Sequence, residues 1–272
     1  PKHALAEATM DSLRAVGIDT SHVLRTDSGR LGLYFLETGA NQRPSNVIYD
    51  REDSAIAITP AADYDWAAVF EGAQWLHLSG ITPALSRTAA EATRVAAEAA
   101  KAAGCQVSID LNFRKKLWNW DESLNARELA EKTMRGILPF VDLVIANEED
   151  CHDVLGIQAG DTDVESGALD TSRYPDVARK VAAQFPNVSR VAITLRESHS
   201  ASHNNWGAML FDVASDSAHF APLDGEGNYQ SYQIKNIVDR VGGGDSFAGG
   251  LIFALTTPEL SEPSVALKYA VA

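Results

Sequence analysis

The alternation of short apolar runs with helical segments after residue 75 constrains the fold of this chain more than any other feature. Four apolar runs have the length of strands, and three alanine-rich or amphipathic segments have the length of helices; in chain order these are 75–81, 86–104, 106–112, 122–138, 141–147, 174–185 and 190–195. Because strand–helix–strand units form right-handed crossovers, this order predicts a mostly parallel sheet with helices on both faces. We also expect a polar surface loop at 161–173, an antiparallel edge strand at 206–213, and helices at 245–256 and 263–272.

The chain before residue 60 has a different pattern. Apolar residues at helical spacing predict a helix within 4–19. The stretches 29–39 and 44–58 are rich in Tyr, Val, Ile and Phe and alternate in part. They predict two or three antiparallel strands in a small separate sheet. We therefore expect a single α/β domain over 1–272 with a β excursion at about 30–58.

Composition and charge exclude several classes of protein. The chain has 272 residues, of which 45% are hydrophobic, and its formal net charge is -14. This charge argues against a surface for nucleic acid or for an anionic membrane. The two cysteines, Cys105 and Cys151, form no Cys-x-x-Cys pair, and no apolar run reads as a membrane span or signal peptide, so we expect a cytoplasmic protein. An anionic substrate would have to be met by local concentrations of arginine.

Polar and charged side chains follow several of the expected strands. In open parallel sheets, ligands bind at the carboxyl ends of the strands. We therefore expect a binding site among the residues at these ends, which are Asn112, Arg114, Asn147, Glu148, Glu149, Asp150, Arg196 and Glu197.

Three consecutive glycines, Gly242, Gly243 and Gly244, precede Asp245 at the start of an expected helix. Glycines let the backbone approach a ligand closely, and the helix N-terminus favours an anion such as phosphate. A carboxylate beside that cradle would serve as a general base for a substrate hydroxyl. The alternative is an ordinary turn in which the aspartate caps the helix. No Gly-Lys-Ser/Thr follows the glycines, so the stretch is not a Walker A loop.

The stretch "DRVGGGDSFAGGL" (239–251) resembles the C-terminal signature of the ribokinase-like (PfkB) carbohydrate kinases, and is most similar to that of the 2-keto-3-deoxygluconate kinases. Further stretches agree with the same family in order along the chain: "GIDTSH" (17–22), "LGLYFLETGANQRPSNVIYDREDSAIA" (31–57), "IDLNFRKKLW" (109–118), "ANEED" (146–150) and "TLRES" (194–198).

The resemblance implies a fold and an activity. The fold is an α/β, ribokinase-like, doubly wound and mostly parallel sheet with a small β-sheet lid. The activity is ATP-dependent and magnesium-dependent phosphorylation of a sugar acid, most naturally 2-keto-3-deoxygluconate. The resemblance also implies a homo-oligomer that pairs through the lid. Two alternatives stay open: a kinase of the same family for a neutral sugar or nucleoside, and a catalytically silent sugar-binding relative.

The resemblance also implies roles for individual residues. Asp245 matches the catalytic base, and the three glycines before it match the anion hole. Positions that hold the sugar acid are matched by Tyr34, Tyr49, Arg51 and Arg114, with Asp245 beside them. Positions that hold ATP are matched by Asn112, Arg114, Asn147, Thr194, Arg196, Glu197, Gly242 and Gly244. Asn147 opens an Asn-x-x-Glu element that the family links to magnesium and phosphate.

The sequence departs from the family pattern at three places. Asp150 stands where that element has Glu; Glu148, Glu149 and Asp150 could support a magnesium ion without ligating it, or simply form a negatively charged helix start. Arg240 replaces the usual Thr of the signature. A leading βαβ unit with a Gly-Gly…Asn sugar motif, and the end of the late helix, are expected to be missing from these 272 residues.

Overall fold

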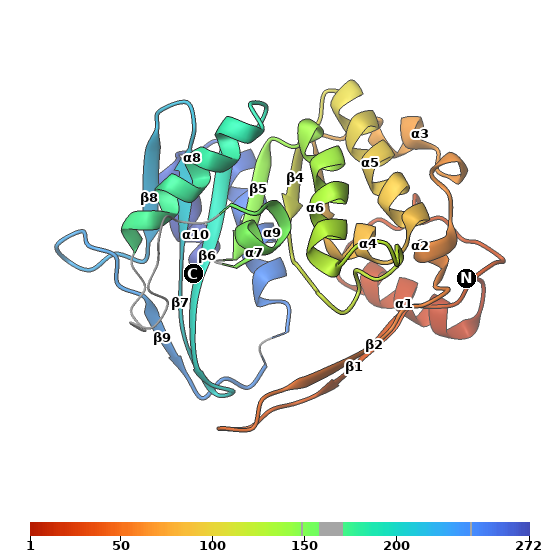
Figure 1. Ribbon diagram of the computed structural model, residues 1–272, viewed down its shortest axis with the longest axis horizontal. Coiled ribbons are helices and arrows are strands. Elements are labelled where there is room, and N and C mark those ends of the chain that lie inside the picture. Colours follow the sequence, from red (N-terminus) through yellow and green to blue (C-terminus); the bar gives the residue numbers. More distant parts are fainter. Residues whose placement is uncertain (148, 158–170, 240) are drawn as a thin grey trace. The chain divides into compact units, whose positions relative to one another are not determined.

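The computed structural model of the protein describes residues 1–147, 149–157, 171–239 and 241–272 (Figure 1). Most of the expected loop at 161–173 lies outside these residues. The chain divides into two compact units: the first comprises 1–36, 47–107 and 114–140, and the second comprises 37–46, 108–113 and 141–272. Each unit is described by itself.

The main sheet has seven strands in the order β3-β4-β5-β6-β7-β8, and β9 pairs with β7. The strands are β3 (Trp75–Ser79), β4 (Gln106–Asp110), β5 (Leu143–Asn147), β6 (Arg190–Ser200), β7 (His203–Asp212), β8 (Ser217–Ala221) and β9 (Tyr232–Lys235). The pairs β4–β5 and β5–β6 are parallel, whereas β7 pairs antiparallel with β6, β8 and β9. The predicted antiparallel strand is confirmed, but its predicted edge position is wrong, because β7 lies between β6 and β8.

Helices of the second unit cover both faces of its strands. They are α7 (Asp150–Leu155), α8 (Tyr174–Gln184), α9 (Gly243–Thr256) and α10 (Pro263–Val271). In Figure 1, α8 lies in front of the strands and α10 lies behind them. Gly250 of α9 permits close helix packing, since a Cβ there would stand 3.2 Å from the Cα of Ala270. Phe247 of α9 is buried and meets the Trp206 ring edge-on, with 6.1 Å between ring centroids.

The first unit is largely helical. It contains α1 (Ala4–Ala15), α2 (Ala55–Ile58), α3 (Trp66–Phe70), α4 (Ile81–Ala84), α5 (Arg87–Ala102) and α6 (Ala126–Ile137). In α5 the Ser86 hydroxyl accepts the N–H of Ala89, and small alanines let the helix pack closely through its buried face. In α6, Asn125 and Glu128 form a reciprocal capping box. The helix expected within 4–19 is confirmed.

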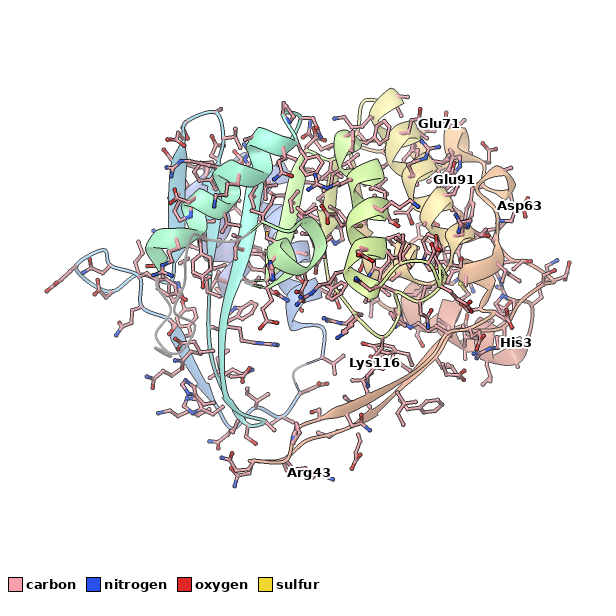
Figure 2. The ribbon with its side chains drawn as sticks, viewed as in Figure 1. His3, Arg43, Asp63, Glu71, Glu91 and Lys116 are labelled. Carbon is pink, nitrogen blue, oxygen red and sulfur yellow. The ribbon has the colours of Figure 1, made fainter. Side chains whose placement is uncertain are left out.

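A two-stranded sheet of β1 (Leu33–Glu37) and β2 (Asn46–Asp50) forms the expected β excursion, which we call the lid. The stretch 55–58, which left room for a third strand, is instead the short helix α2. The lid tip contacts the β6–β7 turn, because the N–H of Ala201 donates to the carbonyl of Asn41 over 2.9 Å. Figure 2 labels Arg43 near this tip. The chain therefore has a mixed sheet flanked by helices, together with a small separate sheet, as expected from the sequence.

No helix in the part of the chain that the structure describes is both long and apolar enough to cross a membrane.

Candidate active site

The glycine turn opens α9 at the place where the sequence predicts an anion cradle. Gly242 is the N-cap and has φ +79°, a left-handed conformation that favours glycine. The other two glycines have ordinary helical positions, and a Cβ built on Gly243 or Gly244 would meet no atom within 4 Å. The backbone conformation therefore favours glycine at 242, while packing requires glycine at none of the three positions. The open space over the other two leaves the first-turn N–H groups accessible to a ligand.

Asp245 lies in the first turn of α9, three residues after the N-cap, and is exposed. The N-cap of this helix is Gly242, so Asp245 is not the N-cap residue. Asp245 lies on the surface beside the glycine turn. The nearest atom to a Cβ on Gly242 would be Oδ2 of Asp245, at 3.9 Å.

Two predicted nucleotide ligands meet where the parallel pairing of β5 with β6 ends. Asn147 and Thr194 are partners in the parallel register, and the hydroxyl of Thr194 donates to the carbonyl of Ala146 over 3.4 Å. Both side chains are half-buried. This pair lies at the carboxyl end of the parallel strands, as the sequence predicts.

The sequence predicts that Arg196 and Glu197 follow the end of the strand. They lie instead within β6, because this strand continues to Ser200. The extension is stabilised by its antiparallel pairing with β7, where Glu197 faces Asn205. The Asn205 side-chain amide donates to Glu197 Oε2 over 2.6 Å. Arg196 is exposed and stands opposite Trp206. The two residues thus lie in the part of β6 that pairs with β7, and not in a loop after the strand.

The end of β4 is joined to the end of β5 through Asp150. Asn112 has φ +37°, and its N–H donates to Asp110 Oδ1 over 3.0 Å. The next N–H, of Phe113, donates to Asp150 Oδ1 over 3.0 Å, and the N–H of Asn147 donates to Asp150 Oδ2 over 3.0 Å. Asp150 is only 3% exposed. Sequence reasoning missed this link because Asp150 and Phe113 lie 37 residues apart.

Asn147, and not one of the acids, caps the start of α7. Its side-chain oxygen accepts the N–H groups of Glu149 and Asp150 over 2.8 and 2.9 Å. Glu149 is exposed and makes no capping hydrogen bond. Glu148 lies outside the described residues. The expected acidic helix start is present, because Asp150 and Asp153 occupy the first turn of α7.

The predicted sugar ligands of the lid form one cluster in the first unit. The guanidinium carbon of Arg51 lies 5.8 Å from the Tyr34 ring centroid and 5.4 Å from the Tyr49 centroid. Among the described residues, no carboxylate lies within 4.0 Å of a nitrogen of Arg51, whereas the neighbouring Arg30 pairs with Asp50. The two tyrosine rings therefore hold the guanidinium without neutralising it.

Arg114 is exposed, and its carbonyl accepts the N–H of Leu117 over 2.8 Å at the start of the segment that follows β4. Two further exposed cations, Lys115 and Lys116, follow it, and Lys116 is labelled in Figure 2. Arg114 belongs to the first unit and Asn112 to the second.

Within the described ranges, no three His, Cys, Asp or Glu side chains are grouped so as to hold a metal ion. Magnesium is usually bound by one or two carboxylates together with substrate phosphates and water. Such an arrangement needs no preformed protein cluster.

Comparison with known proteins gives consistent matches. The model of the pfkB family carbohydrate kinases matches residues 1–196. The 2-dehydro-3-deoxygalactonokinase of Haloferax volcanii is 30% identical over 266 residues, which cover 98% of this chain and 70% of that protein. The 2-dehydro-3-deoxygluconokinase of Bacillus subtilis is 27% identical over 244 residues, which cover 89% of this chain but only 62% of that protein.

Among solved structures, the crystal structure of 2-dehydro-3-deoxygluconokinase from Thermotoga maritima superposes with a TM-score of 0.84. It is 38% identical in sequence, and the match covers 100% of this chain and 74% of that one. A fructokinase from Xylella fastidiosa, at 19% identity and a TM-score of 0.70, shares the fold.

Proposed function

Because the chain belongs to the pfkB family of carbohydrate kinases, we propose that it transfers the γ-phosphoryl group of ATP to the 6-hydroxyl of 2-keto-3-deoxygluconate. The observation that carries the choice of a sugar acid is Arg51, a cation held between two tyrosine rings with no carboxylate partner among the described residues. The proteins from Haloferax volcanii, Bacillus subtilis and Thermotoga maritima act, by their names, on 2-dehydro-3-deoxy sugar acids.

The lid cluster provides the sugar-acid subsite in this proposal. A guanidinium presents two parallel N–H donors that match the two oxygens of a carboxylate. The rings of Tyr34 and Tyr49 fix its position, and their hydroxyl groups can bond to sugar hydroxyls. Arg114 assists on the side of the transferring phosphate.

Asp245 acts as the general base. Its carboxylate accepts the proton of the sugar 6-hydroxyl while that oxygen attacks the γ-phosphorus, the bond from phosphorus to the bridging oxygen breaks, and ADP leaves. The N–H groups at Gly242, Gly243 and Gly244 stabilise the charge on the transferring phosphoryl group. Two observations support this role for the glycines: the space over Gly243 and Gly244 is open, and the exposed carboxylate of Asp245 lies beside them.

The nucleotide lies, in this proposal, over the carboxyl ends of β4 and β5 and the adjoining middle of β6. Backbone and side-chain groups of Asn112, Asn147 and Thr194 contact its phosphates, with Arg114, Arg196 and Glu197 around them. Magnesium, bound with the phosphates, neutralises their negative charge. Residues 1–272 act as one kinase domain, of which the lid is about residues 30–58.

The lid also pairs subunits in this proposal. Tyr34 and Tyr49 face the same guanidinium, so the alternation of side chains along a strand sends Leu33, Phe35 and Ile48 to the opposite face. These three side chains are 39%, 57% and 59% exposed. A two-stranded sheet is marginal alone, and an apolar outer face suits burial against the same face of a second copy.

The test is an assay of ADP formation with a panel of acceptors. We expect turnover with 2-keto-3-deoxygluconate or its galacto epimer, and little with fructose, ribose or a nucleoside. Preferential turnover of a neutral acceptor would refute the choice of a sugar acid. ATP binding by calorimetry without any ADP formation would instead support the silent relative.

A further inference from the structure

Asp150 is a buried acid whose two oxygens each accept a backbone N–H from a different strand end. Oδ1 accepts from Phe113, which follows β4, and Oδ2 accepts from Asn147, the last residue of β5, both over 3.0 Å. The side chain is 3% exposed. We propose that Asp150 is a positioning residue that fixes the ends of β4 and β5 against each other and so sets the backbone that meets the nucleotide phosphates. This inference rests on the proposed function.

The parallel ladder does not hold these ends by itself. The N–H of Leu111 still donates to the carbonyl of Ile145 over 2.9 Å, but the next residue, Asn112, has left-handed backbone at φ +37°. A left-handed conformation is costly for a residue with a side chain and persists only when its neighbours enforce it. Asp110 accepts the N–H of Asn112, and Asp150 accepts the N–H of Phe113. The two carboxylates thus enforce the unusual turn from either side.

The second strand end is fixed by reciprocal hydrogen bonds. Asp150 accepts the N–H of Asn147, while the side chain of Asn147 accepts the N–H groups of Glu149 and Asp150. This closes the turn between β5 and α7 and orients the Asn147 side chain. Asn112 and Asn147 are the residues that contact phosphate in the proposed function, so Asp150 acts through them.

The length of this side chain matters. An aspartate spans the two N–H groups at 3.0 Å each, whereas a glutamate adds a methylene in a buried position. In the Asp150→Asn variant, the side-chain amide would accept one of the two N–H groups and present a donor to the other, which leaves a buried donor unsatisfied. The Asp150→Glu variant keeps the charge and adds a methylene, so it tests whether the reach of the side chain to both N–H groups matters. The magnesium concentration needed for activity separates this role from one that serves magnesium.

The experiment measures MgATP binding by calorimetry and the kinetic constants of Asp150→Asn and Asp150→Glu. We expect both variants to weaken MgATP binding and raise its KM by about tenfold or more, the effect of losing one charged hydrogen bond. The KM for the sugar acid should stay within about twofold, and the free magnesium concentration that gives half-maximal activity should not change. The calorimetric measurement of MgATP binding needs no sugar substrate. Its result can therefore be interpreted even if the proposed sugar substrate is wrong.

Asn125→Ala is the matched control, since it removes the capping box of α6 and has no place in the proposed site. It should lower the melting temperature without changing the KM for MgATP. If the Asp150→Asn variant does not fold, the Asp150→Glu variant alone tests the positioning role. Normal MgATP binding in Asp150→Glu, or an altered magnesium requirement with unchanged KM, would overturn the positioning role.

Discussion

Removal of the Arg51 guanidinium should reduce activity on the sugar acid selectively. The cation has no carboxylate within 4.0 Å among the described residues, so its charge is available to a substrate. A charge-assisted hydrogen bond contributes about 1.5–3 kcal/mol, which corresponds to about 10- to 150-fold. Arg51 is half-buried, so solvent screens part of the attraction, and we count one such bond instead of two. Arg51→Ala should therefore lower kcat/KM for the acid by about 10- to 150-fold.

The structure also limits the damage to folding. Arg51 contacts two tyrosine rings, and each such contact contributes about 0.5–1 kcal/mol at an exposed site. The variant should lose about 1–2 kcal/mol of unfolding free energy and remain folded. Arg51→Lys keeps the charge but loses the planar fork, so its kcat/KM should fall between those of the wild type and Arg51→Ala.

The assay compares the acid with its carboxamide, which keeps the carbon skeleton and removes the charge. Arg51→Ala should lower kcat/KM for the acid only, and the KM for ATP should stay within about twofold. Arg43→Ala is the control, because Arg43 is an exposed lid cation already paired with Glu37 over 2.7 Å. An equal loss for acid and carboxamide would show that Arg51 only supports the lid, and the reasoning would fail.

Three other substitutions test the remaining parts of the site. Asp245→Asn should lower kcat by about 10²–10⁴-fold while calorimetric ATP binding persists, and near-normal turnover would remove it as the base. Gly243→Ala should keep or raise the melting temperature, because the added Cβ meets nothing within 4 Å, yet lower kcat/KM for ATP at least about tenfold; unchanged ATP kinetics would exclude a phosphate cradle there. Gly136→Ala in α6, equally open, is its control and should change stability alone. Phe35→Lys should convert a dimer to a monomer in light scattering at micromolar concentration, and a wild-type monomer would refute lid pairing.

The parts of this structure that the sequence predicts are those fixed by local chemistry. The helix α5 begins after Ser86 and ends before Gly104, which has φ +84°, so both ends follow from the identity of a single residue. The glycine turn is equally local, since Gly242 has the left-handed backbone that only glycine adopts easily. Such signals need no knowledge of the partner elements.

Errors arise where a distant partner decides the structure. The polar stretch after Leu195 predicts that β6 ends there, but pairing with β7 carries the strand to Ser200. A two-stranded antiparallel arm can expose polar side chains on its surface, so polarity does not mark its end. The role of Asp150 is hidden for the same reason. A buried carboxylate is stable only with its hydrogen-bond partners, and one of these partners is 37 residues away.

Charge pairing in the N-terminal part of the chain explains how a protein with a net charge of -14 can attract an anionic sugar. The four other arginines among residues 1–58 are already paired: Arg14 with Asp11, Arg25 with Glu7, Arg30 with Asp50, and Arg43 with Glu37. These pairs stabilise the segments that carry them but offer little field to a ligand. Aromatic rings hold Arg51 by their quadrupoles and leave its full charge and its N–H donors available. A carboxylate that replaces water at this guanidinium therefore gains an attraction without breaking any of these four ion pairs.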